Sequence, residues 1–122
     1  MDFLEKYREQ CYAALRIVSG FMFIFHGIPK LAKVMDGTAM WIHQIAGPIE
    51  VIGGALIMIG LYTSRAAFLS SGLMASAYWY AHASRGGWPI DNGGELAIMF
   101  CFAFLYIASR GSGMWSVDSK RS

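Results

Sequence analysis

Residues 45–62 read IAGPIEVIGGALIMIGLY and contain one charged side chain, Glu50. The length of this stretch is close to the roughly 20 residues that a helix needs to cross a hydrocarbon layer about 30 Å thick. Three comparable apolar stretches occupy residues 11–31, 66–83 and 93–109. Four such stretches within 122 residues predict four transmembrane helices.

The composition also indicates a membrane protein. Apolar residues make up 56% of the chain and charged residues 15%, against roughly 45–50% and roughly 25% in soluble domains. A domain this small has a large exterior that polar residues must cover in water, so we expect lipid to cover much of it. One alternative stays open, because a core helix of a soluble bundle passes the same hydropathy test.

The connections between the apolar stretches are too short to hold a second domain. We therefore predict one transmembrane domain over residues 1–122, an all-α, integral membrane, antiparallel four-helix bundle built from two hairpins. Four crossings place both termini on one side, and basic residues are more frequent on the cytoplasmic side. That side would carry Lys6, Arg8, Arg16, Arg65, Arg110, Lys120 and Arg121, and the other side Lys30, Lys33 and Arg85. The termini are expected to be short cytoplasmic tails.

Two classes of function are not indicated by the sequence. The net charge of +2 and the scattered basic residues do not provide the basic face that nucleic-acid binding requires. Cys11 and Cys101 lie far apart, without the spacing of a zinc site or a redox CxxC pair. We predict no nucleic-acid partner and no metal site.

One ionisable side chain from each expected helix falls near the outer surface, namely His26, Glu50, His82 and Glu95. Such groups are costly in lipid and usually face the bundle interior, where they pair with one another. We expect them to share a pocket. The alternative is that they are interfacial residues in reach of headgroup water, and it is strongest for His82.

Two glycines lie on the same helical face as Glu50, three residues before it and four residues after it. Gly47 and Gly54 would let a neighbouring helix approach closely, so we expect protein to enclose the carboxyl group. Enclosure favours its neutral form unless a cation lies beside it. Lys30 is expected to extend outward to the headgroups.

A faint repeat relates the two halves of the chain. Glu50 precedes Arg65 by fifteen positions, and Glu95 precedes Arg110 by the same number. A parallel repeat of this kind would place a site between the two hairpins. Arg16, Arg65 and Arg110 are expected to be headgroup anchors, with a site for an anionic lipid or a partner as the alternative.

These landmarks together resemble the DoxX family of small four-helix bacterial membrane proteins. The resemblance covers roughly residues 11 to 118 and rests on Arg16, FHGIPKL at 25–31, EVIGGAL at 50–56, Gly60, Arg65, NGGE at 92–95 and GSGMWSVD at 111–118. It implies a multi-pass protein of the bacterial inner membrane, and it links the chain to thiosulfate:quinone oxidoreduction, quinone-related detoxification and thiol stress.

The first functional hypothesis is a membrane redox component that binds a quinone or couples to a quinone-linked oxidoreductase, as an enzyme subunit. A quinone needs an apolar slot for its ring and donors for its oxygens, and imidazole and protonated carboxyl groups can donate and relay protons. Glu50 and His26 would be the catalytic residues, and His82, Glu95 and Tyr78 would bind the substrate. A membrane or periplasmic redox protein would be the partner.

Two alternatives stay open. In the first, the chain is a non-catalytic structural or assembly subunit of a membrane complex, and its polar groups only hold the bundle together. In the second, His26 and His82 are the axial ligands of a haem. The sequence does not fix the oligomeric state, and a homo-oligomer is compatible with each hypothesis.

Overall fold

A computed structural model describes residues 2–121, and these contain helices and no strand. The long helices are α2 (Arg8–Met35), α3 (Trp41–Ile59), α4 (Thr63–Ala77) and α6 (Glu95–Arg110). The short elements are α1 (Asp2–Glu5), the π-helical turn η1 (Tyr78–His82), the 3-10 turn η2 (Ala83–Arg85), α5 (Pro89–Asn92) and α7 (Val117–Arg121). The predicted all-α class is confirmed.

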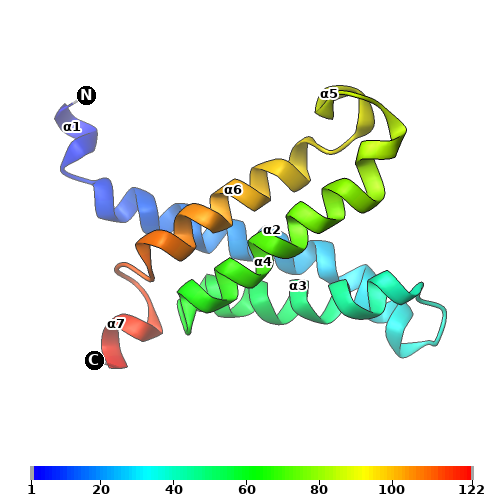
Figure 1. Ribbon diagram of the computed structural model, residues 1–122. Helices are drawn as coiled ribbons and strands as arrows, with labels where there is room; N and C mark the ends of the chain where they lie inside the picture. Colours follow the sequence, from blue (N-terminus) through cyan, green and yellow to red (C-terminus); the bar gives the residue numbers. More distant parts are fainter. Residues whose placement is uncertain (1, 122) are drawn as a thin grey trace.

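The long helices form two hairpins that cross each other. Helix α2 packs along α3 and α4 packs along α6, while α3 and α4 form the main contact between the hairpins (Figure 1). The α2–α3 loop and α5 lie at one end of the molecule, and α1, the α3–α4 turn and α7 lie at the other (Figure 1). The hairpins diverge toward the end that carries α5, which leaves room between them there.

Within the described part of the chain, two helices are long and apolar enough to cross a membrane, α2 with 28 residues and α3 with 19. Helix α2 extends beyond the expected residues 11–31 at both ends because hydropathy marks only the apolar part of a helix, whereas Arg8 and Lys33 continue it. Helix α4 has 15 residues and α6 has 16. The helical turns η1 and η2 continue α4 directly as far as Arg85.

Glycines set the distance between α2 and α3. A Cβ on Gly20 would lie 2.6 Å from the carbonyl oxygen of Gly54, and a Cβ on Gly27 would lie 2.7 Å from the Cβ of Glu50. At Gly47 a Cβ would lie 3.0 Å from the backbone nitrogen of Leu31. Side chains at these positions would push the helices apart, so the two backbones are in direct contact, as small residues permit in lipid.

Aromatic side chains fill the space where the hairpins cross. Phe23 of α2 is fully buried, and its ring centroid lies 5.4 Å from that of Phe100 and 4.7 Å from that of Phe104. Ile57 and Ile107 are also fully buried in this core. Apolar packing therefore joins the hairpins in the middle of the molecule. They diverge beyond this point, toward the end that carries α5.

Arg16 joins the hairpins at the opposite end. Its side chain is fully buried, and its guanidinium donates hydrogen bonds to the backbone carbonyls of Ile57, Met58, Ser112, Met114 and Trp115. The prediction that Arg16 is a headgroup anchor is wrong. The segment after α6 folds back over it, and five carbonyl dipoles replace the water that a buried cation loses.

Asp118 continues this connection to the start of α4. Its carboxylate accepts hydrogen bonds from the backbone N–H groups of Tyr62 and Thr63 and from the hydroxyl of Ser112. The backbone N–H of Asp118 donates to the carbonyl oxygen of Gly60. Helix α4 starts at Thr63, ahead of the expected residue 66, because a side chain 55 positions away binds its first N–H groups.

We predict that Arg16→Met lowers the free energy of unfolding in detergent by about 3 kcal/mol or more, since each hydrogen bond from a charged donor contributes about 1.5–3 kcal/mol. Arg65→Met is the matched control, because Arg65 is exposed and a change there should stay within about 0.5 kcal/mol. Unfolding followed by circular dichroism measures both. Equal stability of the two variants would contradict the role given to Arg16.

A second prediction concerns acid stability. Burial raises the pKa of Asp118, but the hydrogen bonds from Thr63, Ser112 and Tyr62 outweigh it and lower the pKa from 3.8 to about 2. Since the folded value is the lower one, Asp118 stabilises the fold fully above pH 3.8, and this contribution disappears as the pH falls to about 2.

The stability difference between the parent protein and Asp118→Asn should therefore shrink as the pH falls through this range. Asp118 is partly exposed, so we expect a total change of about 1 kcal/mol after allowing for solvent screening. Unfolding curves of both proteins between pH 6 and about pH 2 measure it. A difference that stays constant with pH would show that the carboxylate is not held in this way.

Candidate functional site

A cavity of about 250 Å³ lies between the two hairpins. Its polar wall consists of His26, Lys30 and Glu50 from α2 and α3, and His82 lines it from η1 in the other hairpin. Its apolar wall consists of Met74, Ala77, Leu96, Ala97 and Phe100, and Gly93 completes it. Three of the predicted site residues, His26, Glu50 and His82, thus line one cavity, although they come from α2, α3 and η1.

Glu50 and Lys30 form a salt bridge in this cavity. The Nζ atom of Lys30 lies 2.6 Å from Oε2 of Glu50, whose side chain is 1% exposed, while that of Lys30 is 28% exposed. The expected enclosure of Glu50 is therefore present, and Gly27 and Gly47 supply it by holding α2 against α3. The expectation that Lys30 extends outward to the headgroups is wrong, because its ammonium pairs with the enclosed carboxylate, which would be costly to bury without a charged partner.

His26 lies on α2 one turn before Lys30. Its ring is exposed and meets the ring of Phe100 edge to face at a centroid distance of 5.6 Å. Within residues 2–121, neither ring nitrogen of His26 has a hydrogen-bond partner. The side chain can therefore rotate and present either nitrogen to a ligand in the cavity.

His82 is held more firmly than His26. Its Nδ1 atom lies 3.2 Å from the backbone carbonyl oxygen of Asn92, and its ring stacks on that of Tyr78 at a centroid distance of 6.5 Å. The turn η1 contains the wide π-helical hydrogen bond from the backbone N–H of Ala83 to the carbonyl of Tyr78. Such turns are frequent at functional sites because they change the direction of the following side chains.

Asn92 positions the segments around His82, although sequence reasoning did not single it out. Its side chain is 3% exposed and donates from Nδ2 to the Tyr78 hydroxyl and to the carbonyl of Gly86. Its Oδ1 atom accepts a hydrogen bond from the backbone N–H of Gly94. The available signal was an asparagine directly before two glycines, the first of which adopts a φ of +75°.

The structure does not place Tyr78 and Glu95 in this cavity. Tyr78, the first residue of η1, instead lines an apolar cavity of about 260 Å³ together with Trp79 and Phe102. Glu95 is exposed in the first turn of α6, where a carboxylate stabilises the positive end of the helix dipole. Within residues 2–121 no group of three or more His, Cys, Asp or Glu side chains is placed to hold a metal ion.

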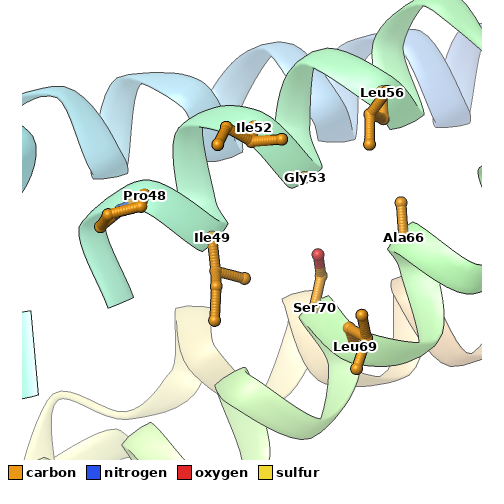
Figure 2. Close-up of a pocket in the computed structure, with 8 residues that line it drawn as sticks. All are labelled: Pro48, Ile49, Ile52, Gly53, Leu56, Ala66, Leu69 and Ser70. Carbon is orange, nitrogen blue, oxygen red and sulfur yellow. The ribbon is translucent and has the colours of Figure 1, made fainter. Parts of the chain in front are cut away.

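An apolar cleft of about 190 Å³ runs between α3 and α4. Figure 2 shows Pro48, Ile49 and Ile52 on one side and Ala66 and Leu69 on the other, with the hydroxyl of Ser70 directed toward Gly53. That hydroxyl is buried and has no hydrogen-bond partner among the described residues. The cleft and the cavity are lined by neighbouring parts of the same helices, since Ile49 precedes Glu50 in α3 and Ser70 is one turn before Met74 in α4.

The salt bridge makes an asymmetric prediction. Lys30→Met leaves the carboxylate of Glu50 buried without a partner and should cost about 3–5 kcal/mol of unfolding free energy. Glu50→Gln leaves only the partly exposed ammonium of Lys30 and should cost about 1–2 kcal/mol. The double variant should be more stable than Lys30→Met alone, and unfolding in detergent measures all three. Equal losses in the two single variants would contradict the pairing.

Comparison with known proteins supplies a family. The DoxX family model matches residues 12–83, more than half of the chain. A protein of Haemophilus influenzae described as uncharacterized is 41% identical over 130 aligned residues, which cover 98% of this chain and 97% of that protein. No solved structure matches the chain. The matched segment contains the polar wall of the cavity, and the chain belongs to the DoxX family.

Proposed function

We propose that this protein is a membrane redox component that binds a quinone in the cavity between the two hairpins. The observation that carries the proposal is the composition of that cavity. The ion pair of Glu50 and Lys30 and the imidazole of His26 line it from the α2–α3 hairpin, and the imidazole of His82 lines it from the other hairpin, together with apolar side chains of α4 and α6.

The chemistry of a quinone matches this lining. Its ring is apolar and fits against Phe100, Leu96 and Met74, while its carbonyl oxygens accept hydrogen bonds from the Lys30 ammonium and the imidazole N–H of His26. The cavity is smaller than the roughly 300–1,000 Å³ of drug-sized ligand sites. It suits one ring system.

The cleft between α3 and α4 is the place that we propose for the tail of the ligand. Membrane quinones carry long apolar tails, and this cleft is lined by aliphatic side chains that include Ile49, Ile52 and Leu69 (Figure 2). A ring in the cavity and a tail in the cleft would reach the site sideways from the lipid. The ligand is then a quinone dissolved in the membrane.

The surface of the helices favours a position in the bilayer. Large apolar side chains are exposed on α4 and α6, including Phe68 at 63%, Leu69 at 67% and Phe102 at 63%. Soluble monomers rarely expose continuous apolar surface of this kind. We infer a multi-pass protein of the bacterial inner membrane, a four-helix bundle with both termini in the cytoplasm.

Within this proposal Glu50 and His26 take up and release the protons that accompany quinone redox chemistry, and His82 contacts the bound ring. We assign no ligand contact to Tyr78 or Glu95, which lie outside the cavity. The electrons pass to or from a membrane or periplasmic redox protein, so that the chain acts as the quinone-binding subunit of an oxidoreductase. Purified protein that holds no quinone but co-purifies with a stable partner would favour the structural subunit instead.

The proposal predicts that purified protein in nanodiscs binds a long-chain quinone and that Glu50→Gln weakens binding about tenfold or more. The reason is that Lys30 loses its charged partner and with it a fixed position, and a charge-assisted hydrogen bond contributes about 1.5–3 kcal/mol. Equilibrium dialysis with ubiquinone and menaquinone measures the affinity, and circular dichroism confirms that the variant is folded. Unchanged affinity in folded Glu50→Gln would remove Glu50 from the site.

Two neighbouring residues provide a matched control for the tail. Leu69→Trp adds bulk to the cleft, whereas Phe68→Trp changes an exposed residue outside it. Leu69→Trp should weaken binding of a long-chain quinone and leave a tailless quinone unaffected, and Phe68→Trp should change neither. If both substitutions have the same effect, the tail does not lie in the cleft.

A further inference from the structure

His82 has one free ring nitrogen. Its Nδ1 atom faces the backbone carbonyl oxygen of Asn92 at 3.2 Å. A carbonyl oxygen can only accept a hydrogen bond, so Nδ1 must carry the proton that is shared between them. In a neutral imidazole the other nitrogen, Nε2, then holds a lone pair and acts as an acceptor.

The partner of Nδ1 cannot easily move away. All the polar atoms of the Asn92 side chain are engaged, Nδ2 with Tyr78 and Gly86 and Oδ1 with Gly94. The Tyr78 ring lies against the backbone of Gly94, where a Cβ would come within 2.5 Å of it. Tyr78 also stacks on the imidazole, so the ring and its carbonyl partner are held by the same residues.

The two hairpins therefore present different hydrogen-bonding groups to the cavity. The ammonium of Lys30 on α2 can only donate hydrogen bonds, and His26 can rotate to donate or accept. His82 lines the cavity on the other side, and its Nε2 has no hydrogen-bond partner among residues 2–121. A carbonyl oxygen placed against this nitrogen would repel its lone pair, whereas a hydroxyl group would donate to it.

We propose that Asn92 fixes His82 as a hydrogen-bond acceptor and that the cavity consequently prefers a ligand with a ring hydroxyl, the quinol, over the corresponding quinone. This inference rests on the proposed function and specifies the form of the ligand. Asn92 is a positioning residue here, since it acts through the imidazole. A site that hydrogen-bonds a ligand hydroxyl discriminates strongly against analogues that lack the hydroxyl. Because this cavity is partly open, we expect a smaller preference, a difference of about tenfold in affinity.

The first test is independent of any ligand. Nitrogen-15 NMR of the parent protein, with histidine labelled and His26 and His43 identified by substitution, reports which nitrogen of His82 carries the proton. We expect the proton on Nδ1 and a free Nε2. A proton on Nε2, in a neutral or a cationic ring, overturns the proposal.

The second test uses probes that are stable to oxidation, 1-naphthol and its methyl ether 1-methoxynaphthalene. The parent protein should bind the naphthol about tenfold more tightly, a difference of about 1.4 kcal/mol. His82→Asn keeps a donor near the Nδ1 position but has no atom at the Nε2 position, so it should lose the preference. His82→Gln is the matched control, because its amide oxygen can occupy the Nε2 position and should retain part of the preference.

The outcomes separate this inference from the proposed function. Equal binding of the two probes by the parent protein overturns the preference even when ubiquinone binds. An unchanged preference in His82→Asn overturns the role of His82. If ubiquinone and both probes fail to bind, the proposed function fails and the ligand preference with it, while the NMR result independently decides whether Asn92 holds the imidazole.

Discussion

Direct backbone contact between α2 and α3 is the constraint on which the site depends. Gly20 and Gly54 meet without a side chain between them, and Gly27 lies against the Cβ of Glu50. Only at this distance can Lys30 reach across to the carboxylate, and only this proximity removes Glu50 from lipid and water. A single methyl group at Gly27 would separate the helices where the ion pair forms. The polar wall of the cavity therefore depends on glycines, which put no side chain between α2 and α3.

The other end of the molecule explains why the cavity stays open. The two hairpins are tied together where Arg16 binds the carbonyls of the C-terminal segment and where Asp118 caps α4. Around Phe23 they are packed by aromatic rings. Beyond that point the hairpins diverge (Figure 1), and the space between them is lined by the polar residues. Fixing one end of a crossed pair of hairpins lets the far end separate without loss of the fold.

Much of this could be predicted from the sequence where a local pattern carries the signal. Hydropathy located the helices, and the spacing of Gly47 and Gly54 around Glu50 indicated its enclosure. Arg16 gave no such signal, because three of its five partners lie about a hundred positions away, in a segment without hydropathic pattern. The sequence also gave no signal for the direction of Lys30, because its aliphatic stem can carry the ammonium either into the cavity or out to the headgroups. The bounds of helices 11–31 and 66–83 differed because polar residues and a distant cap extend them.

Glu50 and Glu95 show that a repeat in sequence does not determine whether equivalent residues are buried. Both residues precede an arginine by the same interval, yet Glu50 lies in the middle of α3, buried against Lys30, and Glu95 is exposed at the start of α6. The neighbouring helix decides the outcome for Glu50, since α2 brings glycines and a lysine to it. The cavity therefore has an ion pair on one hairpin and an imidazole on the other. A ligand that binds Lys30 and His82 together would connect the two diverging ends, which the rest of the structure leaves unjoined.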